Sequence, residues 1–207
     1  MTTPQPVLLT TYQGAESWPS FSPDGNQIAF AWNGEGEDNF DIYVKLVGPG
    51  TPLRLTTDPA PDIRARWSPD GQKIALMRQL DSDTVAVLLV SPLGGPETRL
   101  GQFHTRRAVI GLLASLCWSA DSRHLLAAAS QARNQPNAIL RLSIDTREVK
   151  TLATITGAAE GYTSPDLSPA GRTLAAVRVA GARTRIPRVF ERGATQPRGM
   201  HRRSNAG

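Results

Sequence analysis

The strongest constraint on the fold of this chain is an eight-residue pattern that recurs four times along it. Each copy begins with an aromatic residue or leucine, continues with Ser-Pro-Asp-Gly or a close variant, and ends on Ile or Leu. The copies start at Phe21, Trp67, Trp118 and Leu167, so successive copies lie 46, 51 and 49 residues apart. A period of about 40–50 residues is typical of architectures in which similar units bury their apolar faces against one another. We therefore expect a stack of repeated units.

The chemistry of the pattern predicts a tight turn between two strands. Proline presets φ for a type I turn, aspartate suits the next position, and glycine adopts the left-handed conformation that reverses the chain. The third copy has Ala120 and Ser122 in place of Pro and Gly, and the fourth has Ala170 in place of Asp. We expect those two turns to be looser or of another type.

The segments between the turns read as short strands. In the first unit they cover residues 28–32, 41–47 and 52–56, with an acidic, Gly-rich loop at 33–39, and the next two units follow the same order. Four short strands per unit of this length are typical of a propeller blade. We predict an all-β fold, a β-propeller of four-stranded antiparallel blades over residues 6–180. Its complete blades are expected at about 15–57, 62–102 and 113–155.

Both ends of the repeat region look incomplete. The fourth unit shows two strands, so we expect a half blade at 162–179. Residues 6–11 (Pro-Val-Leu-Leu-Thr-Thr) resemble residues 52–57 and are expected to be the outer strand of a preceding blade. The prediction is about three and a half blades in an incomplete ring, a fragment of a longer propeller. Open blade edges are templates for pairing, so self-association is expected too.

The positive charge of the chain lies in its last residues. The net charge is +5, but residues 181–207 carry seven arginines and one acid, a net +6, which leaves −1 for residues 1–180. The body therefore has no electrostatic footprint for nucleic acid. For the tail there are three interpretations: a disordered basic arm that binds nucleic acid or an acidic surface, an inert extension, or translation out of the original frame from about residue 179. The third is favoured, because the strand pattern is lost within a blade and the segment has seven arginines and no lysine.

With its aromatic-Ser-Pro-Asp-Gly turns, each followed by an Ile-Ala strand in the first two units, the chain resembles bacterial TolB-type, WD-like β-propellers over residues 6 to about 179. The resemblance implies six or so blades around a channel and a role in binding other proteins. Such propellers also occur joined to serine/threonine kinase, winged-helix or prolyl-oligopeptidase-like hydrolase domains. The alternative is therefore the propeller remnant of a multidomain enzyme or regulator. The family allows a periplasmic location, or a cytoplasmic one in a kinase or regulator.

No residue pattern specifies a reaction. The Gly-x-Ser-x-Gly elbow of hydrolases and the kinase motifs are absent. The spacing of His104, His124 and His201 makes no metal site. An acidic cluster within the first unit offers hard oxygen ligands for Ca²⁺, but it lacks the calcium-loop pattern, so a solvated loop is favoured. Its members are Glu35, Glu37, Asp38 and Asp41. We expect a non-enzyme with no catalytic, cofactor-binding or metal-binding residues.

The remaining unusual residues favour packing over chemistry. Cys117 is expected to be a buried small apolar residue. Trp67 and Trp118 begin repeat motifs and are expected to anchor the core. For Trp18 and Trp32 both roles remain open, packing in the core or lining a binding rim. No run approaches the roughly 20 apolar residues of a membrane span. The N-terminus has no basic start followed by an apolar signal core.

Together these observations predict a non-catalytic module for protein–protein interaction or sensing. Its partner is expected to be another protein, bound where the sequence differs most between blades. These stretches are the loops at residues 33–39, 79–83 and 130–137.

Overall fold

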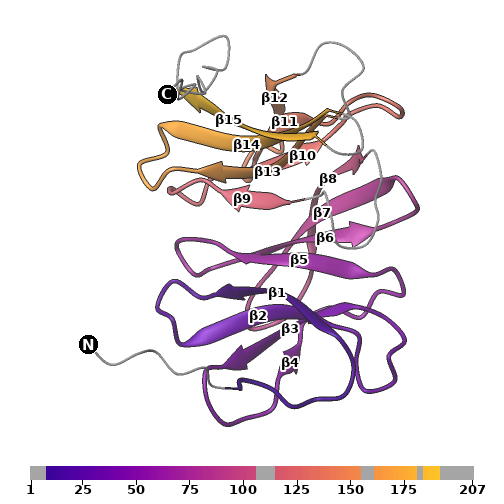
Figure 1. Cartoon of the computed structure of the whole chain (residues 1–207). Coiled ribbons are helices and arrows are strands. Elements are labelled where there is room, and N and C mark those ends of the chain that lie inside the picture. Colours follow the sequence, from indigo (N-terminus) through magenta and orange to yellow (C-terminus); the bar gives the residue numbers. More distant parts are fainter. Residues whose placement is uncertain (1–7, 106–114, 155–160, 181–183, 192–207) are drawn as a thin grey trace, which may run out of the picture.

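The computed structural model describes residues 8–105, 115–154, 161–180 and 184–191 (Figure 1). In these ranges all regular structure is β, arranged as four antiparallel sheets that follow one another along the molecule (Figure 1). The same ranges hold no helix with the length and apolar character needed to cross a bilayer. The predicted all-β propeller fold is confirmed.

Three of the sheets have four strands each, paired in the order in which they occur in the chain. The first sheet contains β1 (Glu16–Phe21), β2 (Gln27–Trp32), β3 (Asp41–Leu46) and β4 (Leu53–Arg54). The second contains β5 (Asp62–Trp67), β6 (Ile74–Gln79), β7 (Thr84–Val90) and β8 (Thr98–His104). The third contains β9 (Leu116–Trp118), β10 (His124–Ala129), β11 (Ala138–Ser143) and β12 (Val149–Ala153). Each sheet is one blade.

The fourth sheet has three strands, one more than expected. It contains β13 (Gly161–Leu167), β14 (Thr173–Ala180) and β15 (Thr184–Glu191), and β15 pairs with β14 along its whole length. The expectation that the blade ends near Val179 and that a tail begins at 181 is therefore wrong for residues 184–191. Pro187 had argued against a strand, but an edge strand tolerates proline because one side of its backbone makes no ladder.

All four repeat turns have the same geometry, so the expectation of two looser turns is wrong. In the first, the Gly25 amide donates to the Ser22 carbonyl at 2.9 Å. The equivalent bond measures 3.0 Å in the third turn, where Ser122 adopts the left-handed conformation (φ 56°) in place of glycine. A non-glycine residue there costs about 1–2 kcal/mol. The motif serine stabilises all four turns, because its hydroxyl accepts a hydrogen bond from the amide five residues further along the chain.

Side chains alternate between the two neighbouring blades along each second strand. In β2, Ala29 and Ala31 face the second blade and pack with Ile74 and Leu76 of β6. The next residues along β6, Ala75 and Met77, face the third blade instead. The second and third blades are thus each an apolar layer between two others. The motif residues Trp67 and Trp118 are buried in the contacts between blades, at 8% exposure each. Their predicted role as core anchors is confirmed.

The innermost strands carry a β-bulge at the same place in three blades. The ladder register shifts between Ser17 and Ser20 in β1, and Trp18, the first of the two residues within the bulge, has a left-handed backbone (φ 53°). Arg64 in β5 (φ 63°) and Ser164 in β13 (φ 50°) repeat this conformation. A bulge redirects a side chain and bends its strand.

The ring of blades is incomplete. The first and fourth blades lie at opposite ends of the molecule (Figure 1). Residues 8–11, part of the segment expected to be the outer strand of a preceding blade, form no strand with any described residue.

Candidate protein-interaction surface

Three loops of different sequence lie at one end of the blades, opposite the repeat turns. They join the second strand to the third in each of the first three blades, at residues 33–40, 80–83 and 130–137. They nearly coincide with the variable stretches singled out from the sequence. The second and third loops touch, because the Arg133 guanidinium reaches the carboxylates of Asp81 (3.2 Å) and Asp83 (3.0 Å). We call this surface the loop end.

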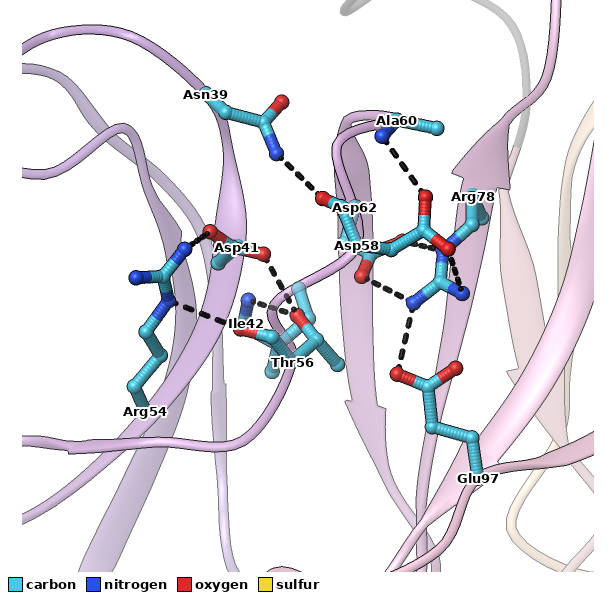
Figure 2. A network of polar contacts seen from close by, with 10 residues as sticks. All are labelled: Asn39, Asp41, Ile42, Arg54, Thr56, Asp58, Ala60, Asp62, Arg78 and Glu97. Atoms are coloured by element: carbon cyan, nitrogen blue, oxygen red, sulfur yellow. Dashed lines mark hydrogen bonds and ion pairs between the residues drawn. The ribbon is translucent and has the colours of Figure 1, made fainter.

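A buried ion-pair network stiffens the loop end between the first two blades (Figure 2). At its centre the Arg78 guanidinium donates from Nε and Nη2 to both carboxylate oxygens of Asp62, each at 2.8 Å. Arg78 also reaches Asp58 at 2.9 Å and Glu97 at 2.8 Å. Asp62 is wholly buried and the Arg78 side chain is 9% exposed. Paired, two-pronged contacts of this kind fix orientation as well as charge.

A second part of the network belongs to the first blade. Asp41, at the start of β3, is bound by the Arg54 guanidinium and by the Thr56 hydroxyl, whose oxygen lies 3.2 Å from Asp41 Oδ1. The same hydroxyl oxygen accepts from the Ile42 amide at 2.9 Å. Asn39 connects the first loop to this region by donating to the Asp58 carbonyl at 2.8 Å (Figure 2).

Burial dominates the electrostatics of the network. It raises the pKa of Asp62 to about 6, although hydrogen bonds from Arg78 and Thr56 work in the opposite direction. Burial raises the pKa of Asp41 as well, although the hydrogen bond and the charge of Arg54 lower it. Hydrogen bonds from Arg78 to Asp62 and Glu97 raise the pKa of Arg78 above its usual value, so this residue stays charged at any physiological pH. The network links the first blade to the second, because the Thr56 hydroxyl contacts Asp41 of the one and Asp62 of the other.

The exposed part of the loop end carries carboxylates on its first two loops. Glu35, Glu37 and Asp38 of the first loop are exposed, and about half of the Asp81 side chain is accessible. Hydrogen bonds from the Asp83 amide and the Thr84 hydroxyl, with the charge of Arg133, lower the pKa of Asp81 to about 2. Asp81 is thus ionised at neutral pH.

The acidic cluster weighed for calcium is divided in the structure. Asp41 points into the buried network, whereas Glu35 and Glu37 face solvent. Among the described residues no group of three His, Cys, Asp or Glu side chains is placed to hold a metal ion. Of the histidines, His104 lies 3.3 Å from the Thr84 hydroxyl and His124 lies 3.8 Å from Asp121, while His201 is outside the described residues.

Cys117, Trp18 and Trp32 are each at least partly buried and contact other parts of the fold. Cys117 is half-buried, and burial raises the pKa of its thiol to about 11, so the reactive thiolate is scarce. Trp32 is buried and its indole donates to the Gln13 carbonyl at 2.8 Å. Trp18 is half-buried, packs on Phe40, and has the Arg64 guanidinium 5.2 Å from its ring centroid.

Sequence reasoning missed Arg78, Asp62 and the Trp18–Arg64 contact. One signal was available for Arg78, since a charged residue directly follows the apolar residues of β6. No pattern in the sequence marks the left-handed bulge that brings Arg64 over Trp18.

Comparison with known proteins agrees with the repeats and the sheets. A model of the TolB beta propeller domain matches residues 1–198. The structure is similar to TolB from Acinetobacter baumannii, with a TM-score of 0.71 and 18% identity over 90% of this chain and 43% of that one. It is similar to a puromycin-hydrolyzing peptidase from Mycobacterium tuberculosis, with a TM-score of 0.70 and 12% identity over 94% of this chain and 30% of that one.

A third similar structure is the β-propeller domain of the Trilobed protease from Pyrococcus furiosus, described as having an open velcro topology. Its TM-score is 0.59, with 15% identity over 92% of this chain and 58% of that one. Comparison with curated protein sequences finds no match. The chain spans less than half the length of the Acinetobacter TolB and of the Mycobacterium peptidase, and identities this low speak for the fold alone. The domain match, which covers most of the sequence, shows that the chain belongs to the TolB β-propeller family.

Proposed function

We propose that this chain is a non-catalytic propeller module that binds another protein through its loop end. The observation that carries the proposal is that three loops of unlike sequence share one end of the stacked blades, braced by the Arg78 network and by the Arg133 contacts. Binding residues are commonly held on loops that a rigid scaffold positions. The ion pairs here supply that scaffold without involving the exposed carboxylates of the first loop.

The charge of the surface suggests the chemistry of the partner. Glu35, Glu37 and Asp38 project from the first loop with no arginine or lysine beside them in sequence. A partner with a basic contact surface would meet complementary charge there. Complementary charge mainly raises the rate of association and confers specificity, and it weakens as salt rises.

Charge reversal on the first loop is expected to abolish this binding. The Glu35→Lys/Glu37→Lys variant of the full chain is compared with Asp145→Lys/Glu148→Lys, an equal reversal at exposed positions of the turn after β11, at the opposite end. Proteins retained by the immobilised wild-type chain are identified, purified and titrated against each variant by calorimetry. We expect at least one purified partner to lose about tenfold or more in affinity with the first variant and less than twofold with the second.

Two results would count against the proposal. Equal losses with both variants would mean that net charge alone governs capture. Unchanged affinities with the loop variant would place the binding surface elsewhere.

A second candidate function is the propeller of a larger hydrolase. It is favoured by the similarity to the Mycobacterium peptidase, of which this chain covers 30%. The same titrations distinguish the two candidates, because in the second case the purified partner is a hydrolase domain.

A further inference from the structure

The first strands of the four blades form one edge of the stack. They lie side by side in the order β1, β5, β9 and β13 (Figure 1). The left-handed bulge places Trp18, Arg64 and Ser164 at the same position of three of these strands, three residues before the residue that begins each repeat motif. Bulges redirect side chains and are frequent next to functional sites. The repeat therefore keeps a backbone feature at this edge while the side chain it carries differs from blade to blade.

Two of these side chains come together between the first and second blades. The Arg64 guanidinium lies over the Trp18 ring, 5.2 Å from its centroid. Phe40, the last residue of the first loop, packs on Trp18 with the ring centroids 5.9 Å apart. All three side chains are partly exposed. We call these three residues the Trp18 platform. It lies where the loop end meets the edge formed by the first strands.

The backbone of β5 is tied to the first blade on both sides of Arg64. Before it, the Asp62 amide donates to the Phe40 carbonyl at 2.7 Å. After it, the Trp67 amide donates to the Ser20 hydroxyl at 3.1 Å. The platform is thus positioned without help from a ligand. Groups that are held in advance lose less conformational freedom when a ligand binds.

A stacked guanidinium is suited to a planar anion. It can lie on an aromatic face and still present its rigid fork of donors, which matches the two oxygens of a carboxylate. Burial lowers the pKa of Arg64, and the charge of Arg66, two residues along the same strand, lowers it further. A carboxylate beside the guanidinium would offset both effects, because it supplies the opposite charge.

The first loop restricts which molecule can carry that carboxylate. Its exposed acids Glu35, Glu37 and Asp38 lie within the loop that ends at the platform. They would repel a polyanion such as a nucleic acid, since like charges oppose close approach. A peptide with a single carboxylate and cationic residues meets complementary charge at both places. The rings of Trp18 and Phe40 favour an apolar side chain next to the carboxylate.

We propose that the Trp18 platform binds a carboxylate of a peptide, beside an apolar residue of that peptide. The inference rests on the proposed protein binding at the loop end, and it adds a defined anchor point for the partner. The carboxylate belongs either to the C-terminus of the partner or to an Asp or Glu side chain, and the test separates these two sources.

Three short peptides probe the platform on the full 207-residue chain. They are acetyl-Lys-Lys-Gly-Phe with a free C-terminal carboxylate, the C-terminal amide of the same peptide, and acetyl-Lys-Lys-Glu-Phe amide. Binding is followed by NMR through the indole N–H signals, with that of Trp18 assigned from the Trp18→Phe variant. We expect the first amide to bind about fivefold or more weakly than at least one carboxylate peptide, because it cannot form the two-pronged, charge-assisted contact. The tighter of the two carboxylate peptides identifies the source.

Substitutions of Arg64 test whether this residue makes the distinction. Arg64→Gln should remove the preference for a carboxylate, and Arg64→Lys, which keeps the charge without the fork, should retain part of it. Both variants keep a residue other than glycine in the left-handed position, and their thermal melts should remain cooperative. Arg123→Gln makes the same change of charge at an exposed position of the opposite end, and should leave the preference unchanged.

Two results would overturn the inference. The first is equal affinity of the three peptides for the wild type, or no binding of any of them. The second is a preference for carboxylate that survives Arg64→Gln. Failure of the proposed function would look different: Glu35→Lys/Glu37→Lys would bind all three peptides as tightly as the wild type does, because their lysines would not contact the first loop.

Discussion

Replacing Arg78 by methionine is expected to destabilise the protein by about 3–5 kcal/mol at pH 8, the usual cost of removing one partner of a buried ion pair. Asp62 is wholly buried and receives two of its hydrogen bonds from this guanidinium. Without Arg78 its charge would stay in the core with no counter-charge of comparable strength. Urea unfolding of the wild type and the variant measures the difference.

The loss should shrink as the pH falls. Asp62 already has a folded-state pKa of about 6, above the ordinary value of 3.8, so between these values the folded state binds more protons than the unfolded state. For such a group the free energy of unfolding falls as pH rises. Removing Arg78 raises the pKa of Asp62 further, since that cation favours the charged carboxylate. We therefore expect Arg78→Met to be distinctly less destabilising at pH 5 than at pH 8.

Two further variants isolate the buried charge. Asp62→Asn combined with Arg78→Met removes both charges and should recover part of the stability at pH 8. It should also remove the pH dependence that Asp62 adds to the free energy of unfolding. Arg123→Met breaks the ion pair between Arg123 and Asp145, whose side chains are 69% and 60% exposed, respectively. It should lower the free energy of unfolding by about 1 kcal/mol or less. Similar losses for Arg78→Met and Arg123→Met would show that the network does not hold the blades together.

Replacing Trp118 by alanine is expected to cost about 3–5 kcal/mol, as for other large core aromatics. The side chain lies in the core shared by the second and third blades, and its indole donates to the Arg66 carbonyl at 2.9 Å. The substitution would leave a cavity and an unpaired carbonyl between two blades. Thermal or urea unfolding gives the measurement.

The matched control for Trp118→Ala is Phe21→Ala, at the same position of the repeat but 62% exposed. In dilute, monomeric samples it should change stability by about 0.5 kcal/mol or less, as exposed substitutions usually do. A large effect at Phe21 together with a small one at Trp118 would contradict the assignment of each motif aromatic to the face of the preceding blade.

Most of the fold could be predicted because the same pattern of turn and strand residues occurs four times in the sequence. The turn residues, the apolar strand after them and the 46–51-residue spacing located each blade, and they singled out Trp67 and Trp118 as core. The tolerance of the turn was underestimated: Ser122 adopts the glycine conformation, and the motif serine keeps its hydrogen bond. A sequence motif therefore shows which residues usually form a turn, but it does not show which substitutions the turn tolerates.

Other features could not be predicted because they depend on contacts between residues that are distant in sequence. β15 was missed because its arginines and Pro187 show no alternation of apolar and polar residues, and its place is set by pairing with β14. The network was missed because Asp62 and Glu97 lie 16 and 19 residues from Arg78 and come together only through strand register. The loop end could be anticipated as a set of variable loops, but the Arg133 contacts that join two of them could not.

The strands β1 to β15 form one stack of four blades. Hydrogen exchange of the full chain, read by mass spectrometry, tests this arrangement most directly, because amides in paired strands of one cooperative unit exchange only when that unit opens. We expect slow, matched exchange for peptides from β2, β6, β10 and β14, and measurable protection in β15. Exchange of β14 and β15 at the rate of an unstructured chain, beside protected first, second and third blades, would contradict the account.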